Sequence, residues 1–349
     1  MEYVLGIFLN IIGSFAGASF YLPFRKVRNW SWESYWIVAG FFTWVILPCL
    51  IAAFTIPNLL IIIRESPPLS ILWTFIFGML WGIGGHSFGL SLRYLGMSLG
   101  MAIALGMTHI AGTLAPPIFM GTFQSLIRSL SGQVIMAGLA VCIIGTFLAG
   151  FAGILKENDY SSPDNKQKYI KEYNFKKGII VTVLSGILSA CFTFAFDASK
   201  PIADVAVKHG ISELWKNNVG LVFITAGSFI SNAILCLAMN IKNKSLSDYW
   251  HGGDASIWIN YLFCAAAGII AYLEFLFYGM GITKMGKNDF VSFSIHLVFI
   301  IIFSTMWGWI TLEFKGSSKR TVTMIIIGIL VLILSVVVMA YGNYLSFIA

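Results

Sequence analysis

Long apolar stretches alternate with short polar connections along the whole chain. A bilayer core about 30 Å thick requires roughly 20 residues of helix to cross it. The runs are continuous rather than alternating, which predicts helices and not the strands of a barrel. The stretches lie near residues 3–24, 34–56, 70–92, 94–116, 133–155, 178–200, 216–241, 257–281, 289–312 and 322–346. The pattern predicts an all-α polytopic membrane protein with ten transmembrane helices.

One polar connection, "KENDYSSPDNKQKYIKEYNFKK" at 156–177, is much longer than the others. It predicts a first five-helix unit at 1–155, a linker at 156–177 and a second five-helix unit at 178–349. A unit with an odd number of spans inserts its second copy upside down, so we expect two inverted repeats. Matching spacings of 11 and 7 residues separate Gly78, Gly89 and Gly96 in the first unit and Gly268, Gly279 and Gly286 in the second.

Composition and charge agree with a lipid environment. The chain is 58% hydrophobic and 11% charged, with a net charge of +7. Its basic residues are spread over many loops, which argues against a nucleic-acid partner. Fifteen of the 22 Lys and Arg residues fall in the loops after the odd-numbered helices. The positive-inside rule then predicts cytoplasmic odd loops, including the linker, with both termini on the outer side of the membrane.

Enzyme and metal chemistry find no support in the motifs. The five cysteines stand singly in apolar runs, without the paired Cys or His spacing of a metal site. HExxH and P-loop patterns are absent from the sequence, and its two GxSxG matches, at 85–89 and 96–100, lie in apolar stretches with no predicted strand before them. We therefore expect no catalytic residues, no metal and no cofactor, and the sequence indicates no oligomeric state.

Ionisable residues within the predicted spans are the first candidates for function, because burying a charge at bilayer depth costs a few kcal/mol. Glu274, His296, Asp197 and His109 all fall in the outer half of the membrane, and His86 falls toward the cytoplasm. Carboxylates and imidazoles at one level are suited to taking up a proton on one side and releasing it on the other. The first four are candidates for proton coupling.

Local pairing is an alternative interpretation of the same residues. It would join Asp197 to Lys200, Glu274 to Tyr278 and His296 to Ser292. These groups would then only stabilise the fold.

A second set of residues is suited to lining a sugar site. Trp81 stands among glycines that leave room around its ring, and an indole can pack on the apolar face of a sugar. The candidate substrate-binding residues are Trp81, Asn10, Ser14, Tyr21, His86 and Tyr278. Core packing and interfacial anchoring are the alternatives for the aromatic members.

GxxxG pairs occur on three of the predicted helices and predict close helix packing. They are Gly13/Gly17, Gly78/Gly82, Gly85/Gly89 and Gly96/Gly100. In a transporter the same surfaces would also let helices slide.

Four stretches carry a resemblance to a known family. They are "SFYLPFRKVRNWSWESYW" (19–36), "GMLWGIGGHSFGLSLRYLGMSLGMAIALGMT" (78–108), "ASKP" (198–201) and "NDFVSFSIHLVF" (288–299). Together they resemble the bacterial L-rhamnose–proton symporters of the drug/metabolite transporter superfamily. The resemblance implies ten helices in two inverted repeats, proton-driven uptake of L-rhamnose and no prosthetic group. Matching residues include Lys26, Trp30, Trp32, Glu33, Trp81, Arg93, Lys200, Asp289 and His296.

Some positions depart from the family pattern. Asp197 stands where the family has Asn, Glu274 where it has Gln, and neither His86 nor His109 belongs to the pattern. These exchanges either rearrange proton coupling for the same sugar or select another substrate, such as an amino sugar or a cation. Lys200 and Pro201 follow the pattern and are expected to end the sixth helix.

With the resemblance, the sequence predicts a multi-pass secondary transporter of the bacterial inner membrane, with both termini in the periplasm. It would import L-rhamnose or a close deoxysugar with protons by alternating access. Its partners would be the sugar, protons and the lipid bilayer. Glu33 and Arg93 are expected to fix topology and cytoplasmic gating. The alternatives are an exporter or transporter of a different small polar metabolite, and a membrane sensor that binds the sugar without moving it.

Overall fold

The computed structural model describes residues 2–95, 97–119, 121–160, 175–251, 256–286, 291–312 and 314–348, and among these it assigns helices joined by turns, bends and irregular segments, with no strand. Residues 161–174 of the predicted linker, Gly96 and Asp289 lie outside the described residues.

Helices cover each of the predicted apolar stretches. In chain order they are α1 (Glu2–Ser19), η1 (Pro23–Lys26), α2 (Trp32–Phe41), η2 (Phe42–Ile46), α3 (Leu47–Thr55), α4 (Leu59–Glu65), α5 (Pro68–Leu95), α6 (Met97–Phe119), α7 (Phe123–Arg128), α8 (Leu130–Tyr160), α10 (Phe175–Lys208), α11 (Asn218–Asn243), η4 (Leu246–Tyr249), α12 (Ile257–Ile282), α13 (Val291–Ile310) and α14 (Lys319–Ile348).

Nine helical segments of the described chain are long and apolar enough to cross a membrane. A shorter apolar segment, Ile103–Phe119, belongs to α6, which has 23 residues in all. α14 is helical despite a run of Ile and Val, residues that otherwise favour strands. In lipid a helix satisfies every main-chain polar group within its own segment, and that requirement outweighs the β preference. The protein is therefore an all-helical, multi-pass membrane protein.

The chain forms two compact units, and each takes helices from both halves of the sequence. Unit 1 comprises Met1–Ile7, Gly84–Thr193 and Lys284–Ala349, and unit 2 comprises Phe8–Ile83 and Phe194–Thr283. The compact units therefore do not coincide with the predicted five-helix repeats. The polypeptide passes between them within α1, α5 and α10, and once more between Thr283 and Lys284.

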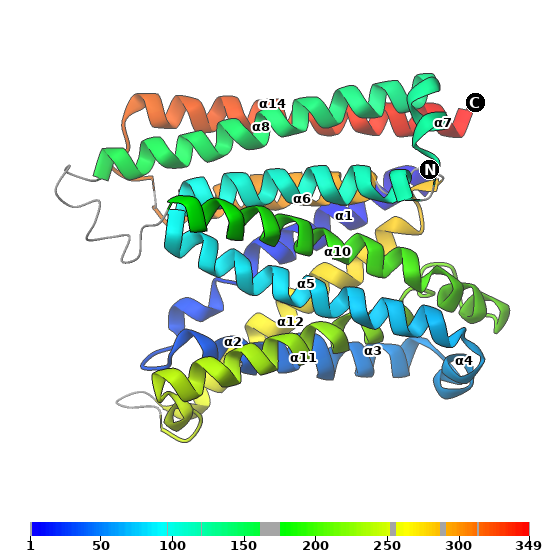
Figure 1. Cartoon of the computed structure of the whole chain (residues 1–349), viewed down its shortest axis with the longest axis horizontal. Helices are drawn as coiled ribbons and strands as arrows, with labels where there is room; N and C mark the ends of the chain where they lie inside the picture. The colour runs from blue at the N-terminus through cyan, green and yellow to red at the C-terminus, as the bar shows by residue number, and fades with distance from the viewer. Residues whose placement is uncertain are drawn as a thin grey trace. The chain divides into compact units, whose positions relative to one another are not determined.

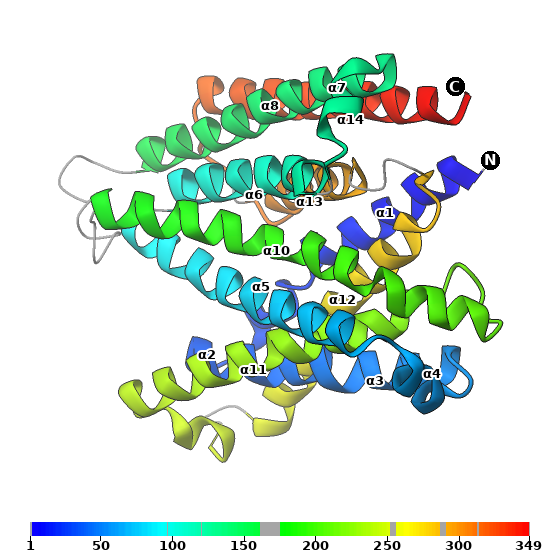
Figure 2. The ribbon, with the colours of Figure 1, turned by 45° about the vertical axis from the view of Figure 1, so that its right-hand side comes forward.

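Unit 1 is built on the pair α8 and α14, which lie side by side (Figures 1 and 2). Glycines let the two helices approach: a Cβ atom on Gly145 would lie 2.9 Å from the Leu332 side chain. The buried side chains of α8, α13 and α14 share one apolar cluster. It contains Ile135, Cys142, Val291, Ile295, Val298, Leu332, Val336 and Met339.

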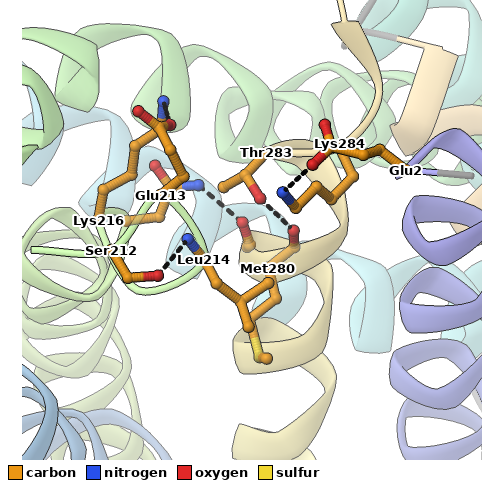
Figure 3. Close-up of polar contacts among 10 residues, drawn as sticks. Glu2, Ser212, Glu213, Leu214, Lys216, Met280, Thr283 and Lys284 are labelled. Carbon is orange, nitrogen blue, oxygen red and sulfur yellow. Dashed lines mark hydrogen bonds and ion pairs between the residues drawn. The ribbon is translucent and has the colours of Figure 1, made fainter.

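Polar contacts hold the ends of unit 1. Lys284 Nζ pairs with Glu2 Oε1 at 3.0 Å, as Figure 3 shows, and the Tyr3 hydroxyl donates to the Ala340 carbonyl at 2.9 Å. The first residues of the chain are thereby attached to this unit.

A carboxylate of α8 caps the start of α14. Asp159 Oδ2 accepts hydrogen bonds from Thr321 Oγ1 at 2.6 Å and from the Ser318 amide at 2.8 Å. These two bonds lower the pKa of Asp159, because they favour the charged form. A negative charge at a helix N-terminus also complements the helix dipole.

Unit 2 packs α11 against α2, η2 and α3, and α12 against α2. Trp36 Nε1 of α2 donates to Asn232 Oδ1 of α11 at 3.0 Å, and Asn218 Nδ2 donates to Thr55 Oγ1 at 2.8 Å. The α2–α3 segment is thus hydrogen-bonded to α11 at both of its ends.

The prediction that Lys200 and Pro201 end the sixth span is wrong, because α10 continues through Pro201 to Lys208. Pro201 cannot donate a hydrogen bond to the Asp197 carbonyl, which costs about 3 kcal/mol in a helix interior. Burial beyond the proline offsets this cost, since each buried Ile contributes about 1.5–3 kcal/mol. The apolar cluster that holds this part of α10 consists of Ile56, Ile62, Ile202, Ala206, Ile211 and Val219.

Candidate functional site

Helices α1 and α12 of unit 2 meet at the first GxxxG pair. A Cβ atom on Gly13 would lie 3.0 Å from the main-chain oxygen of Glu274 and 3.3 Å from the Tyr278 nitrogen. A Cβ atom on Gly17 would lie 2.6 Å from Glu274 Cδ and 2.7 Å from its Oε2. The main chains of the two helices are therefore in contact at Gly13, and the Glu274 carboxylate rests against Gly17.

Two polar residues of α1 lie on the same side of this helix. Asn10 and Ser14 precede Gly17 by seven and three residues, the spacing of one helix face, and both are fully buried. Ser14 Oγ donates to the Asn10 carbonyl at 2.6 Å, so the hydroxyl oxygen faces other groups as an acceptor. We call Asn10, Ser14, Gly17 and Glu274 the α1–α12 seam; it is polar within two otherwise apolar helices.

Aromatic rings flank Glu274 along α12. Trp81 of α5 packs edge-on against Phe275, with ring centroids 5.0 Å apart, and Phe196 of α10 packs edge-on against Tyr278 at 5.3 Å. Tyr278 is 1% exposed. Four of the predicted sugar-lining residues, together with Glu274, thus lie on or against the α1 and α12 helices of unit 2.

Tyr21 lies beyond the end of α1 and packs in an aromatic cluster. α1 ends at Ser19, and Tyr21 follows in the turn before η1 with 48% of its surface exposed. Its ring centroid lies 5.5 Å from that of Phe24 and 6.2 Å from that of Trp36. This aromatic cluster belongs to the end of the span.

Asp197 forms the local ion pair that the sequence offered as the alternative. Its Oδ1 lies 2.7 Å from Lys200 Nζ one turn further along α10, with side-chain exposures of 21% and 44% for Asp197 and Lys200. Because the pair is partly exposed within the chain, its contribution to stability is small.

The histidine candidates belong to unit 1. His109 of α6 is fully buried and its Nδ1 lies 2.9 Å from the Leu105 carbonyl, an acceptor, so Nδ1 carries the hydrogen. His296 of α13 is 2% exposed. The two helices are joined by a hydrogen bond between the Thr113 and Ser294 hydroxyls. The four candidates for proton coupling are therefore divided, with Glu274 and Asp197 in unit 2 and both of these histidines in unit 1.

His86 also belongs to unit 1 and is buried on α5. Two residues before it, Gly84 lets α5 contact α10: a Cβ atom there would lie 2.6 Å from the Ser189 nitrogen, and Ser185 Oγ donates to the Gly84 carbonyl at 2.9 Å. The glycine-dense stretch around His86 therefore serves close helix packing on this side.

Glu33 begins α2 and is buried, with 2% of its surface exposed. Its Oε1 accepts hydrogen bonds from Ser245 Oγ at 2.7 Å and from Asn243 Nδ2 at 2.9 Å. Asp248 Oδ2 accepts from the Ser31 amide and from Ser34 Oγ at the same helix start, at 2.7 and 2.8 Å. These contacts attach α2 to the end of α11, a structural role that complements the gating role predicted for Glu33. The side chain of Arg93 lies outside the described part of the structure.

Sequence reasoning missed two features of the site. It treated Gly17 as half of a packing motif, and only the α1–α12 contact reveals that it faces a carboxylate. It also missed the partners of Glu33, which lie more than 200 residues further along the chain. An acid in the first turn of α2 was the one local signal for that cluster.

Several apolar spans around a half-buried acid, two polar α1 side chains and flanking aromatic rings define a multi-pass membrane protein with a polar site among its helices. Comparison with known proteins specifies the class further. The family model of L-rhamnose-proton symport protein (RhaT) matches residues 1–344. The chain belongs to this family, whose members are transporters and not enzymes.

Curated relatives agree with the family assignment. The "L-rhamnose-proton symporter" of Yersinia pestis (strain Pestoides F) is 35% identical over 342 residues, which is 97% of this chain and 98% of the relative. The protein of the same name from Yersinia pseudotuberculosis serotype O:1b (strain IP 31758) matches to the same extent. The resemblance found from the quoted stretches is therefore confirmed.

Proposed function

We propose that this protein imports L-rhamnose together with protons, by alternating access, across the bacterial inner membrane. Family membership over residues 1–344 is the observation that carries the proposal. The 35% identity to symporters over nearly their full length supports the same substrate pair.

The topology that we propose has ten spans in two inverted repeats, with both termini in the periplasm. A pair of equivalent glycine contacts in unit 2 supports the repeat. Gly78 of α5 approaches the main chain of Ile224 in α11, and Gly268 of α12 approaches the main chain of Ala39 in α2. If α5 corresponds to α12 and α2 to α11, these two contacts are the same contact in the two repeats. Fifteen of the 22 basic residues fall in the loops after the odd-numbered spans, and this excess supports the orientation.

The sugar site that we propose combines Trp81, Tyr278, Asn10 and Ser14, with His86 and Tyr21 as further candidates. An aromatic ring can accept the apolar face of a deoxysugar, and buried polar groups can hydrogen-bond its hydroxyls. The contacts of Trp81 with Phe275 and of Tyr278 with Phe196 support placing these rings beside Glu274.

Glu274 and His296 are the groups that we propose for proton coupling, with Asp197 and His109 as modifiers. A protonated Glu274 is neutral and can be moved through an apolar environment at much lower cost than the anion. A sugar hydroxyl held by the acid would make reorientation depend on both the proton and the sugar. The position of the carboxylate in the α1–α12 seam supports Glu274 as the group that both contact.

The test is uptake of labelled L-rhamnose into proteoliposomes under an imposed pH gradient. We expect accumulation that requires the gradient, and a Glu274→Gln variant that folds but has an altered pH profile. Glu213→Gln, an exposed acid paired with Lys216, is the matched control and should leave uptake unchanged. Uptake that is the same with and without the pH gradient would contradict symport. A wild-type pH profile for Glu274→Gln would show that Glu274 takes no part in proton coupling.

A further inference from the structure

We infer that Gly17 is a positioning residue for the Glu274 carboxylate, and that the missing side chain at this position sets where the acid lies; this inference rests on the proposed function of Glu274. The two glycines of the GxxxG pair in α1 therefore have different roles. Gly13 brings the helices together, and Gly17 makes room for the acid.

The contact distances distinguish the two glycines. A Cβ atom on Gly13 would meet main-chain atoms of α12 and the Phe277 Cβ, at 3.0 to 3.3 Å. A Cβ atom on Gly17 would meet only the carboxyl group among its nearest neighbours: Cδ at 2.6 Å, Oε2 at 2.7 Å and Oε1 at 3.0 Å. The carboxylate therefore lies over the Cα of Gly17.

The acid cannot keep this position once a methyl group is present. Non-bonded carbon atoms settle about 3.5–4.0 Å apart, so a methyl at Gly17 would displace Cδ by about 1 Å. The main chains already touch at Gly13, one turn away, so α12 cannot retreat there without losing that contact. The displacement then falls on the Glu274 side chain itself.

The position matters because Gly17 is on the α1 face that carries Asn10 and Ser14, both fully buried. An acid held against this face can share a ligand or a proton with those groups. A shift of about 1 Å in a reacting or binding group can lower a rate about a hundredfold. Gly17 would thus act on coupling through Glu274 and without touching the sugar.

The experiment is a mutant cycle in proteoliposomes. Gly17→Ala should lower gradient-driven rhamnose uptake about tenfold or more and change the pH at which uptake is half-maximal. Glu274→Asp withdraws the carboxylate by about one C–C bond, about 1.5 Å, and should impair the wild-type protein. In the Gly17→Ala background the same change should improve uptake, because the shorter acid avoids the methyl group.

Gly13→Ala is the matched control, since it places the same methyl between the same helices one turn away. We expect it to lower the amount of folded protein, to leave the pH profile unchanged and not to be rescued by Glu274→Asp. Additive effects of Gly17→Ala and Glu274→Asp would overturn the inference, and so would equal rescue in the Gly13→Ala background. If Gly17→Ala does not fold, Glu274→Asp should restore the folded fraction on size-exclusion chromatography, and failure to do so also overturns it.

A binding assay tests the positioning role of Gly17 separately from the proposed transport function. Rhamnose binding, followed by tryptophan fluorescence, reports on the geometry of the site without transport. If Glu274→Asp weakens binding in the wild type but strengthens it in the Gly17→Ala background, the positioning role is supported. This holds even if Glu274→Gln shows that the acid carries no proton.

Discussion

Replacing Glu33 by Ala should destabilise the protein more than any other single change at the start of α2. The substitution removes an acceptor that receives hydrogen bonds from Ser245 Oγ at 2.7 Å and from Asn243 Nδ2 at 2.9 Å. Hydrogen bonds to a charged group contribute about 1.5–3 kcal/mol each, and the side chain is too buried for water to replace them. With 2% of Glu33 exposed, we expect a loss of about 3–5 kcal/mol in the free energy of unfolding.

Glu33→Gln separates charge from geometry. The amide oxygen can accept the same two hydrogen bonds, but neutral bonds contribute only about 0.5–1.5 kcal/mol each, so the loss should be about 1–3 kcal/mol. Ser245→Ala removes one of the two donors. It should lower the free energy of unfolding less in the Glu33→Ala background than in the wild type, because the hydrogen bond is already lost there.

The assay is equilibrium unfolding in mixed micelles, followed by the fluorescence of the 11 tryptophans. Rhamnose uptake by the folded fraction is measured separately, in proteoliposomes. A loss below about 0.5 kcal/mol for Glu33→Ala would refute the hydrogen-bond reasoning. A normal stability with abolished uptake would assign Glu33 to gating alone.

Three further changes test other parts of the fold. Gly78→Ala places a methyl 2.9 Å from a main-chain carbon of α11 and should cost about 1–3 kcal/mol, whereas Gly85→Ala meets nothing within 4 Å and should be neutral or stabilising. Trp36→Phe removes an indole hydrogen bond of 3.0 Å to α11 and should cost about 0.5–1.5 kcal/mol in the same unfolding assay. Asp159 has a lowered pKa, so its stabilising effect is complete above its unfolded value of about 3.9 and fades as the pH falls through the lower folded value. The melting temperature of Asp159→Asn should therefore fall less steeply than that of the wild type as the pH is lowered from about 5 to about 3.

Each of these three has an opposite result that would count against it. Equal costs for Gly78→Ala and Gly85→Ala would mean that close approach of the helices does not decide the effect. Unchanged stability of Trp36→Phe would show that the indole hydrogen bond contributes nothing net. If the melting temperature of Asp159→Asn falls at low pH as steeply as that of the wild type, Asp159 does not contribute to the pH dependence.

The spans were predictable because their signal is local. Twenty apolar residues in a row cannot cross a bilayer except as a helix, and this holds whatever the rest of the chain does. Even α14, with its many β-branched residues, follows the rule. The end of α10 was not predictable in this way, because Pro201 signals a stop and only the burial of Ile202 and its neighbours explains the continuation.

The site was predictable as a set of residues but not as an arrangement. The rarity of charge within apolar runs singled out Glu274, Asp197, His109 and His296 from the sequence alone. The pairing of Asp197 with Lys200 one turn away was already suggested by the sequence, because both residues stand on one helix face.

The sequence by itself determined the class of the protein, the place of its helices and the short list of ionisable groups within them, because hydropathy accumulates along the chain. Only the tertiary structure decided that Glu274 rests on Gly17 and that Glu33 meets Asn243 and Ser245. Those partners are more than 200 residues apart in sequence. No local pattern specifies such a pair, since it arises from the packing of whole helices against each other.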